Sequence, residues 1–152
     1  MTIATPAPSV AELMSIDPVT IGADEPAHAA EQRMAERRVS GLPVVDRDGR
    51  LVGVVSQTDI VRAHASGQSL AAWPGLAVRH LMTAPAITIR IDESLVDAAR
   101  RMEDRHVHRL VVVAADGRTP IGVVSTLDLV GGLADCLEAR EAREAREPLD
   151  DR

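Results

Sequence analysis

The residues best suited to chemistry form a short motif, Gly-Val-Val-Ser-x-x-Asp, at residues 53–59 and again at residues 122–128. In each copy a β-branched run precedes the serine and a helical pattern follows it. The first turn of a helix presents unpaired backbone N–H groups and the positive end of the helix dipole, which together suit a phosphate. The serine can donate to a phosphate oxygen, and the aspartate can accept from a ribose diol. The motif therefore predicts a nucleotide clamp in each copy.

The same motif also has a purely structural interpretation. Ser-x-x-Asp at the start of a helix resembles a capping box, in which the serine and the acidic residue satisfy backbone N–H groups with no ligand present. Seen alone, the motif leaves both interpretations open.

Catalysis or metal binding would need other groups nearby. No histidine lies at a fixed offset from Ser56 or Ser125, and no Gly-rich phosphate loop of the kinase or hydrolase type occurs. His106 and His108 would share one face of a strand, but a metal site needs three or four ligands and no cysteine or second histidine pair is close in sequence. We therefore expect no catalytic residues and no metal site.

The elements that position the motif belong to a duplication. Residues 13–25 align with residues 81–93 at an offset of 68, and one inserted residue, Thr119, moves the offset to 69. Over residues 13–61, 23 of the 49 positions are identical, which biased composition alone does not produce. One copy of about 50 residues is marginal for a stable core, so we expect two copies packed sheet to sheet with pseudo-two-fold symmetry.

Each copy predicts the order β-α-β-β-α, an α+β fold. Short strands at residues 19–21 and 87–89 are followed by Asp24 and Asp92 as helix N-caps. The next two strands, at 42–45 and 51–55 or 110–113 and 121–124, form a hairpin closed by an Asp- and Gly-rich turn. Helical spacing of apolar residues predicts the buried face of the first helix: Ala27, Ala30, Met34 and Ala35 in one copy, Leu95, Ala98, Ala99 and Met102 in the other.

These patterns divide the chain into five segments. We expect an N-terminal arm at 1–9, a repeat at 10–64, a linker at 65–77, a second repeat at 78–133 and a charged helix or tail at 134–152. Trp73 in the linker is predicted to fill a groove or a dimer contact rather than to bind ligand. The Glu-Ala-Arg repeat at 138–147 predicts a solvated helix that frays towards Arg152, and Gly131 and Gly132 weaken the helix leading into it.

Composition excludes several classes of function. The net charge is −6 and Trp73 is the only aromatic residue, which argues against a nucleic-acid partner. The longest apolar run is far short of the roughly 20 residues that span a bilayer, and the first residues lack a secretory pattern. Cys136 is the single cysteine, so no internal disulfide forms. We expect a soluble cytoplasmic protein without a membrane partner.

The ordered set of motifs, found twice, resembles the cystathionine-β-synthase (CBS) domain, two of which in tandem make a Bateman module. In the first copy the resemblance rests on VAELM at 10–14, PVTI at 18–21, VSGLPVVD at 39–46 and DGRLVGVVSQTD at 48–59. The second copy repeats it at 78–82, 87–89, 107–113 and 122–128, so that it covers about residues 10–131. The resemblance implies a cleft between the copies with two pseudo-symmetric sites, each built from both halves.

The resemblance implies a role for individual residues, and the repeat distributes these residues over two sites. Valine and backbone amides would hold an adenine, the serine and the helix end a phosphate, and the aspartate a ribose. The first site would use Thr20, Val39, Ser40, Gly41 and Pro43 with Ser125, Leu127 and Asp128, and the second Thr88, Val107, His108 and Arg109 with Ser56, Thr58 and Asp59.

The two sites differ, because His108 and Arg109 replace Ser40 and Gly41 of the first copy. A guanidinium is a planar, permanently charged fork that suits phosphate, so Arg109 is expected to supply most of the phosphate affinity. The alternative is that Arg109 pairs with a nearby carboxylate such as Asp104.

The function that the resemblance implies is that of a stand-alone, non-catalytic regulatory module. Its ligand would be AMP, ADP or ATP, with S-adenosylmethionine or NAD as further possibilities and no resident cofactor. Signalling to an unidentified regulated protein would pass through a homodimer whose apolar helix faces pair. The alternative is a structural or partner-binding homodimer with vestigial sites.

Overall fold

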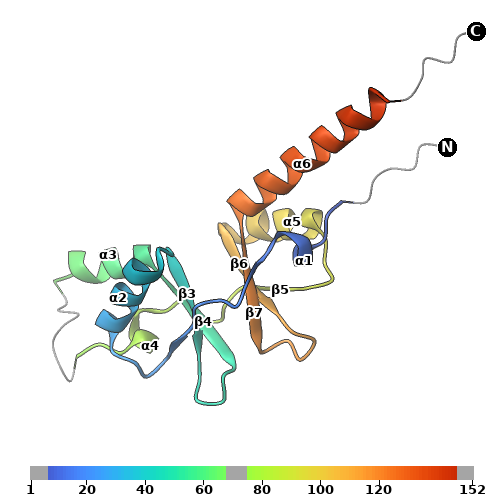
Figure 1. The fold of residues 1–152 in the computed structure, drawn as a ribbon. Coiled ribbons are helices and arrows are strands. Elements are labelled where there is room, and N and C mark those ends of the chain that lie inside the picture. The colour runs from blue at the N-terminus through green and yellow to red at the C-terminus, as the bar shows by residue number, and fades with distance from the viewer. Residues whose placement is uncertain (1–6, 68–74, 147–152) are drawn as a thin grey trace, which may run out of the picture.

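The structure, a computed structural model, describes residues 7–67 and 75–146 and consists of two similar halves (Figure 1). The predicted β-α-β-β-α order is present in both, each preceded by a short lead-in helix. Along the first half the elements are α1 (Val10–Leu13), β1 (Ser15–Ile16), β2 (Ile21–Gly22), α2 (Ala27–Arg37), β3 (Gly41–Val45), β4 (Leu51–Ser56) and α3 (Gln57–Ala65). Along the second they are α4 (Val78–Leu81), β5 (Thr88–Arg90), α5 (Leu95–Arg105), β6 (Arg109–Val113), β7 (Pro120–Ser125) and α6 (Thr126–Glu144).

Each half contains one sheet. In the first, β2 runs parallel to β3 and β3 forms the predicted antiparallel hairpin with β4. In the second, β5 runs parallel to β6, and β6 forms the hairpin with β7. Figure 1 shows the two sheets in the middle of the molecule, with α2 and α3 outside one and α5 and α6 outside the other.

The lead-in segments of the two repeats are exchanged between the halves. Strand β1 extends the second sheet by pairing with β7, where Ser15 lies opposite Val123, and the amide of Val10 donates to the carbonyl of Glu93 at 2.8 Å. Reciprocally, the amide of Val78 in α4 donates to Glu25 at 2.9 Å in the first half. The contacts of the exchanged lead-in segments hold the two halves together, in addition to the chain that connects them.

Two hydrophobic cores form, one under each sheet. Leu42 and Val44 of β3 face the first core, and Leu110 and Val112 of β6 face the second. Since successive side chains of a strand point to opposite faces, the buried residues Pro43 and Val111 face away from these cores. Both faces of the central strands are therefore covered, as the predicted sheet-to-sheet packing requires.

The predicted N-caps of the first helices were wrong. Helix α2 begins after Pro26 and α5 after Ser94, whose hydroxyl accepts the Asp97 amide at 3.2 Å in a capping box. Asp24 and Asp92 lie two residues too early, because a turn separates strand from helix in each half.

Two further expectations about these segments need correction. The first strands begin one or two residues later than predicted, at Ile21 and Thr88. Ala35 and Ala99 are exposed rather than buried, whereas the other predicted core positions of α2 and α5 are buried: Ala27, Ala30, Met34, Leu95, Ala98 and Met102.

The predicted boundary between the second repeat and the tail falls inside one helix, since α6 continues through Gly131 and Gly132 to Glu144. Gly132 lies under Leu13, and a Cβ there would come within 2.5 Å of the leucine Cδ2. This close packing offsets the weak helix propensity of glycine. Residues 138–146 are exposed, as predicted, whereas the fraying towards Arg152 and the position of Trp73 lie outside the described residues.

Candidate functional site

A cleft of about 400 Å³ lies between the halves, where the exchanged lead-in passes β3 and the β7–α6 junction. Its polar side chains come from both halves. Four segments line it: Ser15, Ile16, Asp17, Pro18 and Val19 after α1; Arg38, Val39, Ser40, Gly41 and Pro43 around the start of β3; Arg109 of β6; and Val123, Ser125 and Asp128 of β7 and α6.

Most of the residues predicted for the first site meet in this cleft. Thr20 and Leu127 are not among the residues that line it. The Thr20 carbonyl accepts a hydrogen bond from Arg33 at 3.0 Å, and Leu127 is 81% exposed on α6. The predicted residues that line it are Val39, Ser40, Gly41, Pro43, Ser125 and Asp128.

Both copies of the Ser-x-x-Asp motif form the capping box that the structural interpretation predicts. Ser125 is the N-cap of α6, and Asp128 Oδ2 accepts from its amide at 2.7 Å and its hydroxyl at 2.9 Å. The cap uses only this oxygen: within residues 7–67 and 75–146, Asp128 Oδ1 has no hydrogen-bond or ion-pair partner. The Asp128 carboxylate thus caps the helix through Oδ2 and leaves Oδ1 as a hydrogen-bond acceptor in the cleft.

The equivalent carboxylate of the first repeat is more enclosed. Asp59 Oδ2 caps α3 through the amide and hydroxyl of Ser56, at 2.8 and 2.9 Å. Its Oδ1 lies 3.8 Å from Nη1 of Arg62, and the side chain is 9% exposed. The two motifs therefore share a local structure but differ in what they offer to a ligand.

The other residues predicted for the second site are spread over several environments. His108 and Thr58 are exposed, Val107 packs against the second core, and the Thr88 carbonyl accepts from Arg101 at 3.0 Å. His106 lies at the left-handed C-cap of α5, and His108 precedes β6. The prediction that the two histidines share one face of a strand was therefore wrong.

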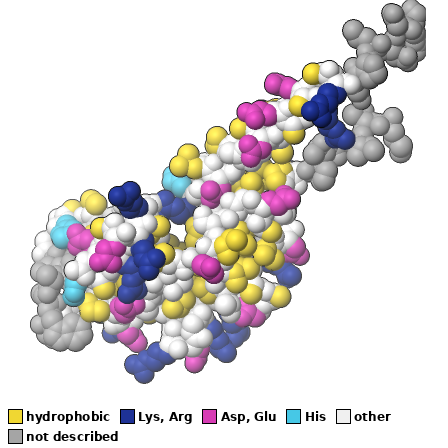
Figure 2. Space-filling model, in the orientation of Figure 1, with side chains coloured by type: hydrophobic (Ala, Val, Ile, Leu, Met, Phe, Trp, Pro, Cys, Tyr) yellow, Lys and Arg dark blue, Asp and Glu magenta, His cyan; other side chains and the backbone are white. Residues whose placement is uncertain are grey.

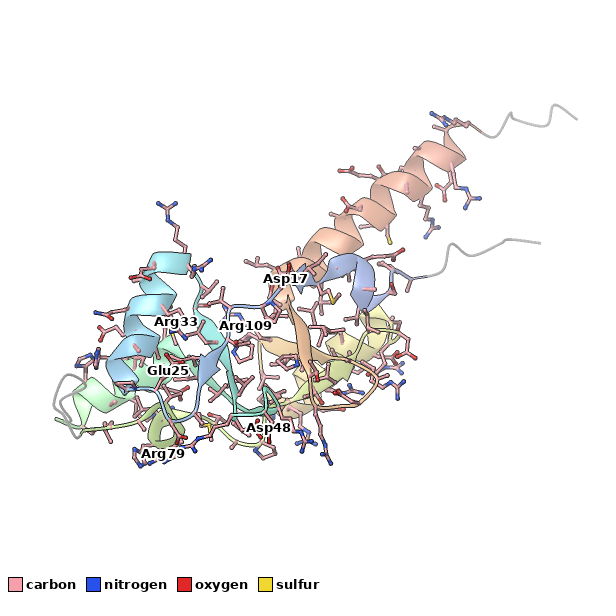
Figure 3. All side chains as sticks on the ribbon, turned by 60° about the horizontal axis from the view of Figure 1, so that its bottom comes forward. Asp17, Glu25, Arg33, Asp48, Arg79 and Arg109 are labelled. Carbon is pink, nitrogen blue, oxygen red and sulfur yellow. The ribbon has the colours of Figure 1, made fainter. Side chains whose placement is uncertain are left out.

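Arg109 lies elsewhere than the repeat suggested. It was predicted in the second site, yet it lines the cleft of the first, and its Nη2 donates to the hydroxyl of Ser40 in the other half. A Cβ on Gly41 would lie 3.1 Å from Nη1, so the glycine leaves room for the guanidinium. The alternative ion pair with Asp104 is not formed. Figure 3 shows Arg109 in the middle of the molecule, between the halves.

Sequence reasoning missed the contribution of the lead-in and of Arg38. Asp17 and Arg38 line the cleft with left-handed backbones, both at φ 53°. Arg38 ends α2 and immediately precedes Val39. Because Val39 is a predicted site residue, this adjacency in the sequence could have indicated Arg38. Asp17 reaches the cleft only because the lead-in crosses to the second half, which no local pattern indicates.

The resolved pKa shifts lie outside the cleft and have structural causes. The largest lowers the pKa of Asp116 to about 2, because the Thr119 hydroxyl and the amides of Arg118 and Thr119 donate to its carboxylate. The hydrogen bond and charge of Arg33 hold the pKa of Glu25 below its usual value, and Arg101 does the same for Glu93. A larger hollow, of about 690 Å³, lies within the first half along residues 22–26 and 45–48, and none of the predicted site residues line it. Among the described residues no group of three or more His, Cys, Asp or Glu side chains is arranged to hold a metal ion.

Comparison with known proteins assigns the fold. The CBS domain model matches residues 10–66 and 78–135. The chain belongs to the CBS domain family. This CBS pair is 29% identical over 137 residues to an uncharacterized protein of Methanocaldococcus jannaschii, covering 83% of this chain and 32% of that protein. It covers 23% of the next curated relative, a homoserine O-acetyltransferase of Methanococcoides burtonii, and so spans at most about a third of these relatives.

Solved CBS pairs have the same architecture. The pair of protein MJ0100, in complex with 5′-methylthioadenosine and S-adenosyl-L-methionine, matches with a TM-score of 0.75 and 25% identity, over 86% of this chain and 98% of that one. A CBS domain protein of Pyrobaculum aerophilum complexed with AMP matches with a TM-score of 0.75 and 27% identity, over 86% and 98%. None of the helices within residues 7–67 and 75–146 of this CBS pair combines the length and the hydrophobicity that spanning a bilayer requires.

Proposed function

We propose that this CBS pair is a non-catalytic regulatory module that binds an adenosyl ligand, such as AMP, ADP or ATP, in the cleft between its halves. The observation that carries the proposal is Asp128 Oδ1, which has no partner in the described part of the chain and lies next to Ser125 at the start of a 19-residue helix. Solved CBS pairs with adenosyl ligands support this class of ligand.

The cleft offers a complementary group for each part of such a ligand. Val19, Val39 and Pro43 provide an apolar wall for an adenine. Asp128 Oδ1, which has no hydrogen-bond partner among the described residues, can accept from ribose hydroxyls. The guanidinium of Arg109, which also lines the cleft, would favour an anionic group. Because these groups come from both halves, a bound ligand favours the arrangement of the halves that it fits best, by its difference in affinity for the two states.

We further propose that the signal passes through a homodimer formed by α6. Leu127, Val130, Leu133 and Leu137 are between 50% and 81% exposed and follow one another at helical spacing. Figure 2 shows apolar side chains along this helix, interrupted by acidic ones. A two-fold axis would let the same stripe cover its own copy, which is the commonest symmetry of soluble oligomers. The regulated partner would then recognise the dimer.

A thermal-shift panel with AMP, ADP, ATP, S-adenosylmethionine and NAD tests the binding function. A ligand at 100 times its Kd should raise the free energy of unfolding by about 2.7 kcal/mol. Absence of stabilisation by every compound would refute the proposal and favour a structural homodimer with vestigial sites.

The variant Asp128→Asn tests the site itself. Its amide oxygen can still cap Ser125, while the negative charge that accepts from the ribose is lost. We expect the affinity for the best ligand to fall about 10- to 100-fold, as for other hydrogen bonds to charged groups. The matched variant Asp59→Asn should leave that affinity unchanged. Equal effects of the two variants, measured by titration calorimetry, would contradict the assignment.

A further inference from the structure

We infer that residues 8–17, the lead-in of the first repeat, form a strap that opens to admit the ligand and closes over it. Residues 76–83, the lead-in of the second repeat, stay fixed. The inference rests on the proposed function and adds to it the segment of the chain that moves. It follows from a difference between the two lead-ins.

The backbone and the apolar cores hold both lead-ins in the same way. Val10 and Val78 are both fully buried, and their amides donate to the opposite half at 2.8 and 2.9 Å. Ser15 lies opposite a residue of β7, just as Thr83 bridges to β4. The other residue of β1, Ile16, is 72% exposed and adds little burial. A difference in how firmly the two lead-ins are held must therefore come from further contacts.

The second lead-in has two further ties to the first half, both through Arg79. Its amide donates to the carbonyl of Ala23 at 2.9 Å, and its guanidinium forms an ion pair with Asp24. Arg47, in the turn between β3 and β4, lies 3.6 Å from the same carboxylate. Figure 3 shows Arg79 at the lower edge of the first half. These contacts attach α4 to the turn that precedes α2.

The first lead-in lacks both ties. Ala11 occupies the position of Arg79 at the offset of 68, so no guanidinium is present there. The carboxylate of Glu12 accepts from the amide of Ser9 at 2.9 Å, and so serves the start of α1 itself. In the described part of the chain no ion pair joins the strap to the second half. The strap is therefore the less firmly held of the two lead-ins.

The strap contacts both the cleft and α6. Its residues 15–17 line the cleft. Leu13 packs on Gly132, where a Cβ would come within 2.5 Å of the leucine Cδ2. At the end of the strap Asp17 has a left-handed backbone, φ 53°, and Val19 beyond it packs against the first core. Asp17 therefore marks the hinge, since a left-handed residue other than glycine relaxes when the contacts that hold it are released.

Opening of the strap would remove one wall of the cleft and the contact on α6 in a single movement. The open state exposes Val10, so it is a minor population, and a ligand that contacts the closed strap reduces it further. Ligand binding is thereby coupled to the packing of α6, the helix that carries the proposed dimer stripe.

Hydrogen exchange of the equivalent amides of Val10 and Val78, followed by NMR, compares the two lead-ins directly. In the ligand-free protein we expect about 10-fold lower protection at Val10, since the strap lacks one hydrogen bond and one ion pair. Saturation with AMP should raise the protection at Val10 and leave Val78 unchanged. Equal protection of the two amides in the ligand-free protein, or an equal gain at both with AMP, would overturn the inference.

The variant Ala11→Arg transfers the missing ion pair to the strap. Asp92 lies at the position equivalent to Asp24, and Ala11 is exposed, so the substitution leaves the core intact. We expect the protection at Val10 to rise about 2- to 5-fold, the range of an exposed ion pair. In stopped-flow mixing, AMP association and dissociation should both slow by the same factor, with Kd unchanged. The control Ala11→Gln, a long side chain without charge, should change neither protection nor rates.

The outcomes separate the gate from the proposed function. Where AMP does not bind, the compound of the thermal-shift panel that binds most tightly replaces it. If the rates of Ala11→Arg are unchanged although Val10 is better protected, the strap is not a gate and the ligand-binding function stands. Equal slowing by Ala11→Arg and Ala11→Gln would also overturn the gate alone. If none of the five compounds of the panel binds, the proposed function fails, and the gate with it.

Discussion

The strand glycines of the two motifs are required by close packing. A Cβ on Gly122 would lie 2.8 Å from both the sulfur of Met14 and the carbonyl oxygen of Ser15. A Cβ on Gly53 would likewise lie 2.8 Å from the sulfur of Met82 and from the carbonyl oxygen of Thr83. In both halves the exchanged lead-in runs directly over the glycine, so the motif that predicts a nucleotide clamp also marks where the repeats cross.

Gly122→Ala should therefore destabilise the protein, whereas Gly131→Ala should stabilise it. The first places a methyl group against backbone and costs roughly 1–3 kcal/mol of unfolding free energy. The second adds a methyl group in open space within α6, where nothing lies within 4 Å, and gains roughly 0.5–1 kcal/mol through helix propensity. Urea denaturation measures both. Destabilisation by both substitutions would contradict this account of α6.

At the scale of elements, an arginine on each first helix fixes the strand that precedes it. Arg33 of α2 donates to the carbonyl of Thr20 at 3.0 Å and pairs with Glu25 through Nη2 at 2.8 Å. Arg101 of α5 does the same with Thr88 and Glu93, at 3.0 and 2.6 Å. In Figure 3 Arg33 and Glu25 lie together on the first half. The two threonines assigned to ligand sites thus have a structural role through their carbonyls.

These ion pairs predict acid sensitivity. Because the pKa of Glu25 is lowered from its usual 4.5, its stabilisation is present above that value and is lost as the pH falls through the lower pKa of the folded state. Glu25→Gln should lower the unfolding free energy at pH 7 by roughly 0.5–1 kcal/mol, a small effect because solvent screens the partly exposed pair. In thermal unfolding between pH 7 and pH 3, the difference in stability between Glu25→Gln and the unaltered protein should decrease as the pH falls. The control Glu103→Gln, on an exposed glutamate, should show no such trend.

At the scale of the whole molecule, the two halves are held together, and the apolar side chains along α6 remain exposed. The exchanged lead-ins and the hydrogen bond from the Leu51 amide to the Arg118 carbonyl, at 2.7 Å, connect the halves. Helix α6, which carries these side chains, projects beyond the body of the molecule (Figure 1). Since α6 carries both Asp128, a residue of the proposed ligand site, and the apolar stripe, a shift of this helix on binding would reach the proposed dimer contact directly.

Replacing Leu133 and Leu137 together by Glu should convert the proposed dimer to a monomer. Both side chains are at least half exposed, so the folded chain tolerates the charges, whereas a paired stripe does not. Light scattering coupled to gel filtration measures the mass, and circular dichroism checks the fold. A protein that is already monomeric without the substitutions would contradict the α6 dimer and leave the cleft unaffected.

The sequence by itself determined the duplication, and it determined the order of elements and the hairpins because propensity and spacing act over a few residues. For the serines at 56 and 125 it left a helix cap as one of two interpretations. It also placed Val39, Ser40, Asp128 and their neighbours in one group through the resemblance to CBS domains. Only the tertiary structure decided that the lead-ins cross, that Arg109 reaches Ser40 69 residues away, and that Asp128 rather than Asp59 keeps an open oxygen. Two nearly identical local motifs acquire different surroundings when the halves pack, and those surroundings depend on contacts between distant segments.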